Sequence, residues 1–332
     1  MLTLGIESSC DETSAAIIED GHTVRSNVIL SQTVHTRFGG VVPEVASREH
    51  IKTIVPVFHQ ALDEAGAAAA DIDLVAATMG PGLVGPLLVG LSFAKGLAFS
   101  LDKPFVPVNH IEGHLAANIL EHPDLRTHHL TLIVSGGHTM LVEVRSFGEY
   151  HILGRTRDDA AGEAFDKVGK LLGLGYPGGA ELDRLAQTGN PKFHRFPRAV
   201  MKDAYQFSYS GLKTAVALYL DKLDAETLAV HKADIAASFQ EAAVDVLVEK
   251  TVRAAEDTGV GDVTISGGVA ANSRLRHLLQ QRLSHLGKRL FFPSLPLCTD
   301  NAAMIAAAGY YRFQKDGAGE FVIDAVPYQR LE

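Results

Sequence analysis

Two histidines four residues apart are the residues of this sequence best suited to chemistry. They are His110 and His114, within the stretch Asn109–Leu115. A helix advances about 100° per residue, so helical structure would place both imidazoles on one face about a turn apart, where one metal ion can bind both. Glu112 would then lie on the opposite face, unlike the carboxylate of a helical His-Glu-x-x-His protease, which follows the first histidine. The spacing is typical of a metal site, although surface or packing histidines can also have it.

Asp300 is a candidate oxygen ligand for the same ion. It precedes the alanine-rich segment Ala302–Ala308, so its alternative role is to cap the N-terminus of a helix. Two histidines and one aspartate would leave positions open for substrate oxygens and would let the metal act as a Lewis acid. Cys10 and Cys298 are too few for a thiolate metal cage or a disulfide framework, and they favour a reducing cytoplasm as the location.

Two glycine-rich turns are suited to binding a phosphate or an adenylate. Ser135–His138 joins the predicted strands Leu130–Val134 and Thr139–Val144, and Gly267–Gly268 follows the predicted strand Asp262–Ser266. Such turns present backbone N–H groups and small side chains to a ligand, although purely structural turns have the same composition. Neither turn matches the Walker pattern. The two turns occupy equivalent places in an α/β pattern of strands and helices that occurs twice in the chain. We therefore expect them to bind a ligand.

Carboxylates near these turns could accept hydrogen bonds from ribose hydroxyls. The sequence predicts a helix that begins at Asp158 and carries Asp159, Glu163 and Asp166 on one face. For Asp158 and Asp159, the alternative to ligand binding is a favourable interaction with the helix dipole. Asp183, farther along the chain, has the same capacity to bind a ribose.

The elements that must position these residues form an α/β pattern that occurs twice. The first half is predicted to open with a hairpin whose tip, Glu7–Glu12, is crowded with hydroxyls and carboxylates. A strand, a glycine turn and an apolar helix follow, and the second half repeats this order, with a helix from Asn272 and a mostly helical insert at residues 158–256. The sequence therefore predicts two α/β domains, 1–109 and 110–332, with a cleft between them. The strands and helices predicted in the first half are Leu2–Ile6, Thr13–Ile18, Val24–Leu30, Glu44–Ala65, Asp73–Thr78, Leu83–Phe99 and Pro104–Val108.

The composition is that of a globular protein. The 332 residues are 46% hydrophobic and 21% charged, and the formal net charge of −9 argues against a chain that coats nucleic acid or an anionic membrane by itself. Lys192–Arg198 and Arg274–Arg289 remain candidate basic patches. No secretion signal is visible at the start, and the apolar run Leu83–Phe99 is interrupted by glycine, proline and lysine, so we interpret it as a buried helix.

Taken together, the motifs resemble one family over almost the full chain: the tRNA N6-adenosine threonylcarbamoyltransferases, the bacterial TsaD family, formerly called O-sialoglycoprotein endopeptidases. The segments that carry the resemblance are Gly5–Thr13, Gly39–Glu44, Gly80–Leu83, Lys95–Gly96, His110–Leu115, Val134–Thr139, Asp158–Lys167, Tyr176–Gly179, Ser210–Thr214, Gly267–Asn272 and Cys298–Asn301.

The resemblance implies an actin-like ATPase (ASKHA) fold with two duplicated ribonuclease-H-like lobes and a central nucleotide cleft. It implies one divalent metal ion, iron with zinc as the alternative, held by His110, His114 and Asp300. Glu12 matches a family position tied to activity, and Glu12 or Asp11 is expected to orient the attacking amine or take its proton. The residues implied in binding threonylcarbamoyl-adenylate are Val134, Ser135, Gly136, Gly137, His138, Asp166, Gly179, Asp183 and Asn272.

The implied activity is an acyl transfer. A threonylcarbamoyl group passes from its adenylate to the N6 amine of the adenosine at position 37 of tRNAs that read codons beginning with A, and AMP leaves. Besides tRNA, the implied partners are a non-catalytic paralogous subunit (TsaB-like) and a small ATPase subunit (TsaE-like).

Three alternative functions remain at this point. A metalloprotease is disfavoured by the expected position of Glu112. In a sugar kinase or chaperone ATPase the histidine pair would have no purpose. A non-catalytic binding subunit would be expected to lose ligand positions that this chain keeps.

Overall fold

The chain forms two compact units. The computed structural model describes residues 1–199 and 204–331. The first unit contains Met1–Leu125, Ser146–Tyr150 and the residues from Pro293 onward, and the second contains Arg126–Arg145 and His151–Phe292. The expected boundary between residues 109 and 110 therefore lies inside the first unit. The difference arises because the last long helix, α10 (Ala302–Asp316), packs on the sheet of the first unit.

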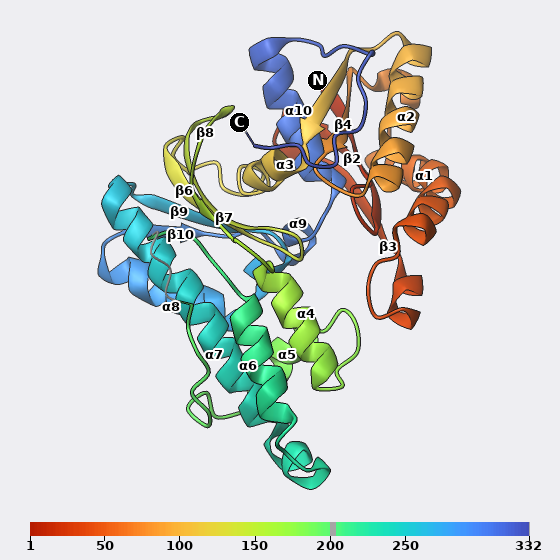
Figure 1. Cartoon of the computed structure of the whole chain (residues 1–332). Coiled ribbons are helices and arrows are strands. Elements are labelled where there is room, and N and C mark those ends of the chain that lie inside the picture. The colour runs from red at the N-terminus through yellow and green to blue at the C-terminus, as the bar shows by residue number, and fades with distance from the viewer. Residues whose placement is uncertain (200–203, 332) are drawn as a thin grey trace. The chain divides into compact units, whose positions relative to one another are not determined.

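The first unit is built on a sheet with the strand order β3-β2-β1-β4-β5. β1, β2 and β3 are antiparallel, whereas β1, β4 and β5 are parallel. Ile17 packs in the same core cluster as residues of α1 and α2, and the next residue, Ile18, packs with α10, so helices cover both faces (Figure 1). Burial on both faces explains why the parallel strands β1, β4 and β5 are mostly apolar runs. The elements of this sheet and its helices are β1 (Leu2–Glu7), β2 (Glu12–Glu19), β3 (Thr23–Ser31), α1 (Pro43–Ala65), β4 (Leu74–Gly80), α2 (Val84–Leu101), β5 (Phe105–Asn109) and α3 (His110–Ala116).

The second sheet has the order β10-β9-β6-β7-β8. Strands β6, β7, β8, β9 and β10 occupy the places that β1, β2, β3, β4 and β5 occupy in the first sheet. The two sheets therefore have the same strand order, and the predicted duplication is confirmed. Two strands were not predicted: β8 has an irregular burial pattern, and β10 has only three residues. The strands are β6 (His129–Val134), β7 (Thr139–Ser146), β8 (Glu149–Arg155), β9 (Asp262–Ser266) and β10 (Arg289–Phe291).

The insert is helical, as predicted, but its first helix starts later. α4 begins at Ala161, so the prediction that Asp158 and Asp159 lie on this helix is wrong. Asp158 instead accepts hydrogen bonds from the backbone N–H groups of Tyr209 (2.8 Å) and Ser210 (3.2 Å), at the start of another helix. Aspartate favours such capping positions over a helix interior. The helices from the insert onward are α4 (Ala161–Leu171), α5 (Gly179–Ala186), α6 (Ser210–Leu220), α7 (Ala225–Thr258) and α8 (Ser273–His285), with the short α9 (Leu295–Cys298) before α10.

Helix α2 is the apolar segment that we expected to be buried. By length and composition alone it could cross a membrane, and 33% of it is buried. Its inner side, which includes Leu87, Leu91 and Ala94, is buried, and the last two residues belong to a core cluster of the first unit. Leu88 and Phe99 are exposed, so α2 also has an apolar outer side.

Replacing Gly5 by alanine is expected to weaken the first unit. An added methyl group would lie 2.1 Å from the carbonyl oxygen of Ala302 and 2.7 Å from the backbone nitrogen of Ala306, so α10 would have to move away from β1. We expect the free energy of unfolding in urea to fall by about 1–3 kcal/mol. Gly96→Ala on α2 is the control, because an added methyl group there meets no atom within 4 Å. A Gly5→Ala protein as stable as the wild type would contradict the close packing of α10.

Candidate metal centre

Three parallel strands bring the first residues of the site to one edge of a sheet. Because β1, β4 and β5 are parallel, their carboxyl ends meet there, which is where α/β sheets bind ligands. Glu7 ends β1, and Asn109 ends β5. The Asn109 side chain also caps α3 by accepting a hydrogen bond of 2.9 Å from the backbone N–H of Ile111. His110, the first residue of α3, therefore lies beside Glu7.

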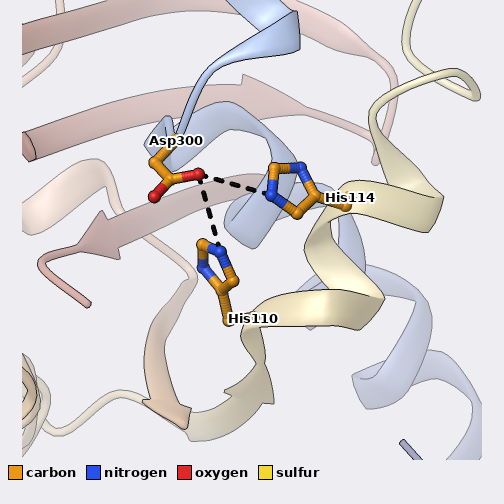
Figure 2. Close-up of side chains that lie close together, drawn as sticks. All are labelled: His110, His114 and Asp300. Carbon is orange, nitrogen blue, oxygen red and sulfur yellow. Dashed lines mark ion pairs between the residues drawn. The ribbon is translucent and has the colours of Figure 1, made fainter. Parts of the chain in front are cut away.

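The three predicted metal ligands lie together in the first unit (Figure 2). Oδ1 of Asp300 is 3.5 Å from Nε2 of His110 and 3.3 Å from Nε2 of His114. The two imidazole rings have centroids 4.8 Å apart, and both histidines are buried. α3 is helical as expected, and its two histidines point toward the same carboxylate.

Asp300 does not cap α10. The capping residue is Asn301, whose side chain accepts a hydrogen bond of 3.0 Å from a backbone N–H in the first turn. Ser14 on β2 accepts a second hydrogen bond, 2.9 Å long, from the first residue of the helix. α3 packs closely on α10, because an added methyl group at Gly113 would lie 2.7 Å from the Ile305 side chain. These contacts leave Asp300 directed toward the histidines.

A buried carboxylate orients His110. Oε2 of Glu7 is 3.0 Å from Nδ1 of His110 and accepts a hydrogen bond of 2.6 Å from the Thr78 hydroxyl. With Nδ1 donating to Glu7, Nε2 of the same ring faces Asp300, as in the carboxylate–histidine–metal arrangements of many metalloproteins. Sequence reasoning missed this role, although Glu7 belongs to the first motif of the resemblance.

The charges around His110 change its protonation. Burial lowers the pKa of His110, but the negative charges of Asp300 and Glu7 and the hydrogen bond to Glu7 raise it by more, to about 9. Burial raises the pKa of Glu7, but the charge of His110 and the hydrogen bonds lower it by more. Without a metal, His110 and Glu7 therefore form a buried ion pair.

The residues fit a divalent metal ion. Two imidazoles and one carboxylate are the ligand types that zinc and iron use in open sites. Both ring nitrogens of His114 are buried and have no hydrogen-bond partner among the described residues. A buried polar atom without a hydrogen bond costs free energy, and a metal ion between Nε2 of His114 and the nearby Asp300 carboxylate would offset this cost.

Glu112 lies away from the metal ligands. It is fully buried, and it accepts hydrogen bonds of 2.7 Å each from the Tyr150 hydroxyl and from Nε of Arg312 on α10. The carboxylate thus fastens α3 to α10 and is not available as a base for metal-bound water. The prediction that it occupies the opposite face of the helix is confirmed.

A buried histidine holds the hairpin tip that carries Asp11 and Glu12. Nε2 of His50 on α1 donates a hydrogen bond of 2.9 Å to the carbonyl oxygen of Cys10, and its Nδ1 is 2.8 Å from the hydroxyl of Thr13. The pKa of Glu12 lies well above its usual range, because of burial and because of the negative charges of Asp300 and Asp11. A carboxyl group with a raised pKa beside candidate metal ligands is a candidate acid–base group.

The predicted adenylate-binding turn belongs to the second unit. Ser135 N donates to His138 O (2.8 Å) to close the turn between β6 and β7, and Gly162 N at the start of α4 donates to Ser135 O (3.1 Å). An added methyl group at Gly267, after β9, would lie 2.5 Å from the carbonyl oxygen of Val134. The ends of β6 and β9 and the start of α4 are therefore in contact. An added methyl group would meet no atom within 4 Å at three glycines of these turns, which are Gly136, Gly137 and Gly268.

The polar residues predicted to bind the adenylate all have protein partners. Asp166 accepts a hydrogen bond of 3.0 Å from the backbone N–H of Gly179. Asp183 accepts hydrogen bonds from the backbone N–H and the hydroxyl of Ser273, at 3.1 and 2.8 Å. The neighbouring Asn272 caps α8. These contacts link the predicted residues into one region of the second unit, and their role in binding a ligand stays a prediction.

The two candidate basic patches differ in how many of their charges are engaged. In Arg274–Arg289, Arg274 pairs with Glu241 (2.7 Å) and Arg289 with Asp262 (2.6 Å). Lys288 donates to backbone carbonyls, so much of this patch stabilises the second unit itself. In Lys192–Arg198, Arg198 pairs with Asp245, and the side chains of Lys192 and Arg195 are exposed.

Metal binding is expected to release a proton from His110. A metal ion at Nε2 must displace the proton that is present below pH 9, so the affinity should rise with pH up to that value, with release of about one proton near neutrality. In the metal-free protein, the raised pKa contributes stability that is fully present below 6.5 and is lost as the pH rises through about 9.

Isothermal titration calorimetry of Zn²⁺ in buffers of different protonation enthalpy measures this release. Glu7→Gln removes one negative partner of His110, so this variant should release fewer protons. Equal heats in all buffers for the wild type would contradict the assignment.

Comparisons with known proteins agree on one family. A family model described as "TsaD: tRNA N6-adenosine threonylcarbamoyltransferase" matches residues 23–307. Proteins named tRNA N6-adenosine threonylcarbamoyltransferase from Clostridioides difficile and Clostridium perfringens are 53% and 51% identical to this chain, over 100% and 99% of it and 98% of each relative.

Solved structures show the same fold at low sequence identity. Full-length HypF in its phosphate- and nucleotide-bound form matches 96% of this chain and 47% of HypF with a TM-score of 0.63 at 15% identity. Component A of (R)-2-hydroxyglutaryl-CoA dehydratase from Acidaminococcus fermentans matches 95% of this chain and 98% of that chain with a TM-score of 0.57 at 17% identity. The predicted actin-like ATPase fold is thereby confirmed. The family match and the identity over the full chain lead to one conclusion: this chain belongs to the TsaD family of tRNA N6-adenosine threonylcarbamoyltransferases.

Proposed function

We infer that this chain is an enzyme that transfers a threonylcarbamoyl group to the exocyclic N6 amine of adenosine in tRNA. Threonylcarbamoyl-adenylate is the donor, AMP leaves, and the acceptor is the adenosine at position 37 of tRNAs that read codons beginning with A. Membership of the family supports the reaction. The observation that carries the mechanism is the convergence of His110, His114 and Asp300 in the first unit.

The three convergent residues would hold one divalent metal ion, iron or zinc. When bound, it supplies Lewis-acid chemistry toward substrate oxygens. The protein keeps these ligands in place before substrate arrives, because Glu7 fixes the ring of His110 and the Glu112–Arg312 pair fastens the helix that carries both histidines. Such preorganisation lowers the cost of aligning the donor.

Glu12 takes the proton in the proposed transfer. The N6 nitrogen forms a bond to the carbamoyl carbon, the bond from that carbon to the adenylate oxygen breaks, and the electron pair leaves with AMP. The amine must lose a proton as it attacks, and the carboxylate of Glu12 accepts it, with Asp11 as the alternative. The backbone N–H groups of Gly136 and Gly137, in the middle of the turn, bind the donor and stabilise negative charge on it.

The contacts of Glu112 argue against a metalloprotease. In that mechanism a carboxylate beside the metal activates water, but Glu112 is fully buried and bound to Tyr150 and Arg312. A sugar kinase or chaperone ATPase would share the fold but would leave His110 and His114 without a purpose.

An exposed apolar surface supports a protein partner for the first unit. Residues of α1 and α2 with large exposed apolar side chains are Ile51 (64% exposed), Val55 (46%), Val84 (54%), Leu88 (41%) and Phe99 (79%). Exposed apolar side chains on neighbouring helices are typical of protein interfaces. This α1–α2 surface is proposed to bind the non-catalytic paralogous subunit. The small ATPase as a further partner and a cytoplasmic location are also proposed.

His110→Ala and Asp300→Ala are expected to abolish transfer, because each removes one of the proposed metal ligands. The measurement is a single-turnover assay with synthetic threonylcarbamoyl-adenylate, tRNA and the proposed partner subunits, together with metal analysis of the purified chain. His22→Ala, an exposed histidine outside the site, is the control. Wild-type rates in both site variants would remove the metal from the reaction.

The transfer rate is expected to depend on the ionisation of Glu12. Its carboxylate is the basic form, and its pKa is raised by burial, Asp300 and Asp11, so the rate should increase as the pH rises through that raised pKa. Glu12→Gln should lower the rate by about 10²–10⁴-fold and remove this rising limb of the pH profile. Glu19→Gln, at the other end of the same strand, should keep both the rate and the profile. An unchanged profile in Glu12→Gln would assign the base to another residue.

Val55→Asp and Phe99→Asp should prevent binding of the paralogous subunit, because each buries a charge in the proposed apolar interface. Size-exclusion chromatography of the mixed subunits measures the association. The threonine variants, Val55→Thr and Phe99→Thr, should have smaller effects. A complex that forms equally well with both aspartate variants would place the interface elsewhere.

A further inference from the structure

A short segment, Val326–Leu331, follows the same sheet edge that carries His110, and we call it the strap. Val326 N donates a hydrogen bond of 2.8 Å to the carbonyl oxygen of Met79, and Gly82 N donates one of 3.1 Å to the carbonyl oxygen of Pro327. The strap is thus tied to the residues at the end of β4. Sequence reasoning did not predict it, because the segment has no regular periodicity.

The end of β5 also holds the strap. The side-chain amide of Asn109 donates a hydrogen bond of 3.0 Å to the carbonyl oxygen of Arg330, while its oxygen caps the helix that begins at His110. One residue therefore connects the strap to the first metal-ligand position.

The glycine motif after β4 is explained by this contact. An added methyl group at Gly80 would lie 1.9 Å from the carbonyl oxygen of Val326, so any larger residue would displace the strap. The motif Gly80–Leu83, which the proposed chemistry does not use, thus provides the site to which the strap binds.

The strap, α10 and the end of β5 line a cavity of about 460 Å³ that is open to solvent. Its lining is Asn109, Arg312 and every strap residue except Pro327. This volume lies in the range of small-molecule sites, which is about 300–1,000 Å³. The whole cavity belongs to the first unit.

The side chains around this cavity suit a nucleotide. Arg312 and Arg330 contribute guanidinium groups, which recognise phosphate oxygens. The Tyr328 side chain is 93% exposed, and an exposed aromatic ring can stack on an unpaired base. The side-chain oxygen of Gln329 is buried and has no hydrogen-bond partner among the described residues, so it can accept a hydrogen bond from a base.

Charge at the cavity wall favours an anionic ligand. Nε of Arg312 donates to the buried Glu112, and its Nη1 is 3.4 Å from Asp316, which fixes this guanidinium group in place. Arg330 is exposed beside it. An apolar peptide would leave the guanidinium group of Arg330 without an anionic partner, whereas the phosphate of a nucleotide provides one.

We propose that this cavity binds a single-stranded nucleotide of the anticodon loop, next to the adenosine that is modified. Tyr328 stacks on the base, and Arg330 and Arg312 bind the adjacent phosphate. The inference rests on the proposed function, because that function brings an anticodon loop to the sheet edge where His110 begins α3.

The test compares RNA binding by strap variants of the full chain, in the presence of the proposed partner subunits. Fluorescence anisotropy with a labelled anticodon stem-loop RNA measures the Kd at several salt concentrations. Tyr328→Ala should weaken binding about tenfold, and Tyr328→Phe should restore it because stacking is kept. Arg330→Ala should also reduce the salt dependence by about one phosphate contact.

Matched controls lie outside the cavity. Val322→Ala changes a side chain that is also 93% exposed, and Arg48→Ala removes an arginine whose side chain is 72% exposed. Both controls should bind the RNA like the wild type. Thermal unfolding of all variants checks that the strap substitutions leave the fold intact.

Unchanged Kd and salt dependence in Tyr328→Ala and Arg330→Ala would overturn the inference, as would an equal loss in the controls. Loss of a partner subunit by these variants, with RNA binding kept, would also overturn it and would assign the cavity to a protein. The transfer assay separates the two claims: transfer by the wild type with normal RNA binding by the strap variants leaves the proposed function standing. Absence of transfer by the wild type would refute the proposed function while the RNA titration still decides the cavity.

Discussion

The hydrogen bond between Glu7 and His110 is the interaction on which the candidate metal centre depends. It joins the last residue of β1 to the first residue of α3, and both side chains are buried. A buried charge without a partner costs several kcal/mol, so neither residue can change without exposing the other to that cost. The bond also selects the ring nitrogen of His110 that faces Asp300. The parallel strands therefore determine the chemistry of the site as well as its location.

Close packing of α10 positions Asp300, the third proposed ligand. Gly5 lets this helix approach β1, Gly113 lets α3 approach it from the other side, and Asn301 with Ser14 fixes its first turn. Asp300 lies just before that turn, so the position of α10 determines the position of Asp300. Small residues at the contact points thus have a functional effect, although none of them touches a ligand.

Local patterns in the sequence predicted most of the fold. The histidine pair, the strands of both hairpins and the glycine turns depend on neighbouring residues, and the structure places them as expected. The proposed role of Asp300 as a metal ligand was predicted from the need for an oxygen ligand and from the resemblance to the family. The alternative role, capping of α10, belongs to Asn301, one residue later.

Long-range contacts account for what could not be predicted. Asp158 caps a helix that begins 52 residues later, so a reading of its neighbours placed it wrongly on α4. Glu7 is oriented toward a histidine 103 residues away, and no local pattern indicates that. The strap has neither periodicity nor a regular element, and only its contacts with the strand ends support the function that is proposed for it. Predictions that rest on ligand contacts of Asp166 and Asp183 stay open, since both residues already bind the protein.

The first unit is completed by the residues from Pro293 onward, which follow the second unit in the sequence. This order has a consequence for biosynthesis. A ribosome produces both histidines long before it produces Asp300, because the whole second unit is translated between them. A nascent or prematurely terminated polypeptide that lacks α10 consequently offers only an incomplete set of metal ligands. The proposed ligand set is thus complete only after the chain has been translated through Asp300.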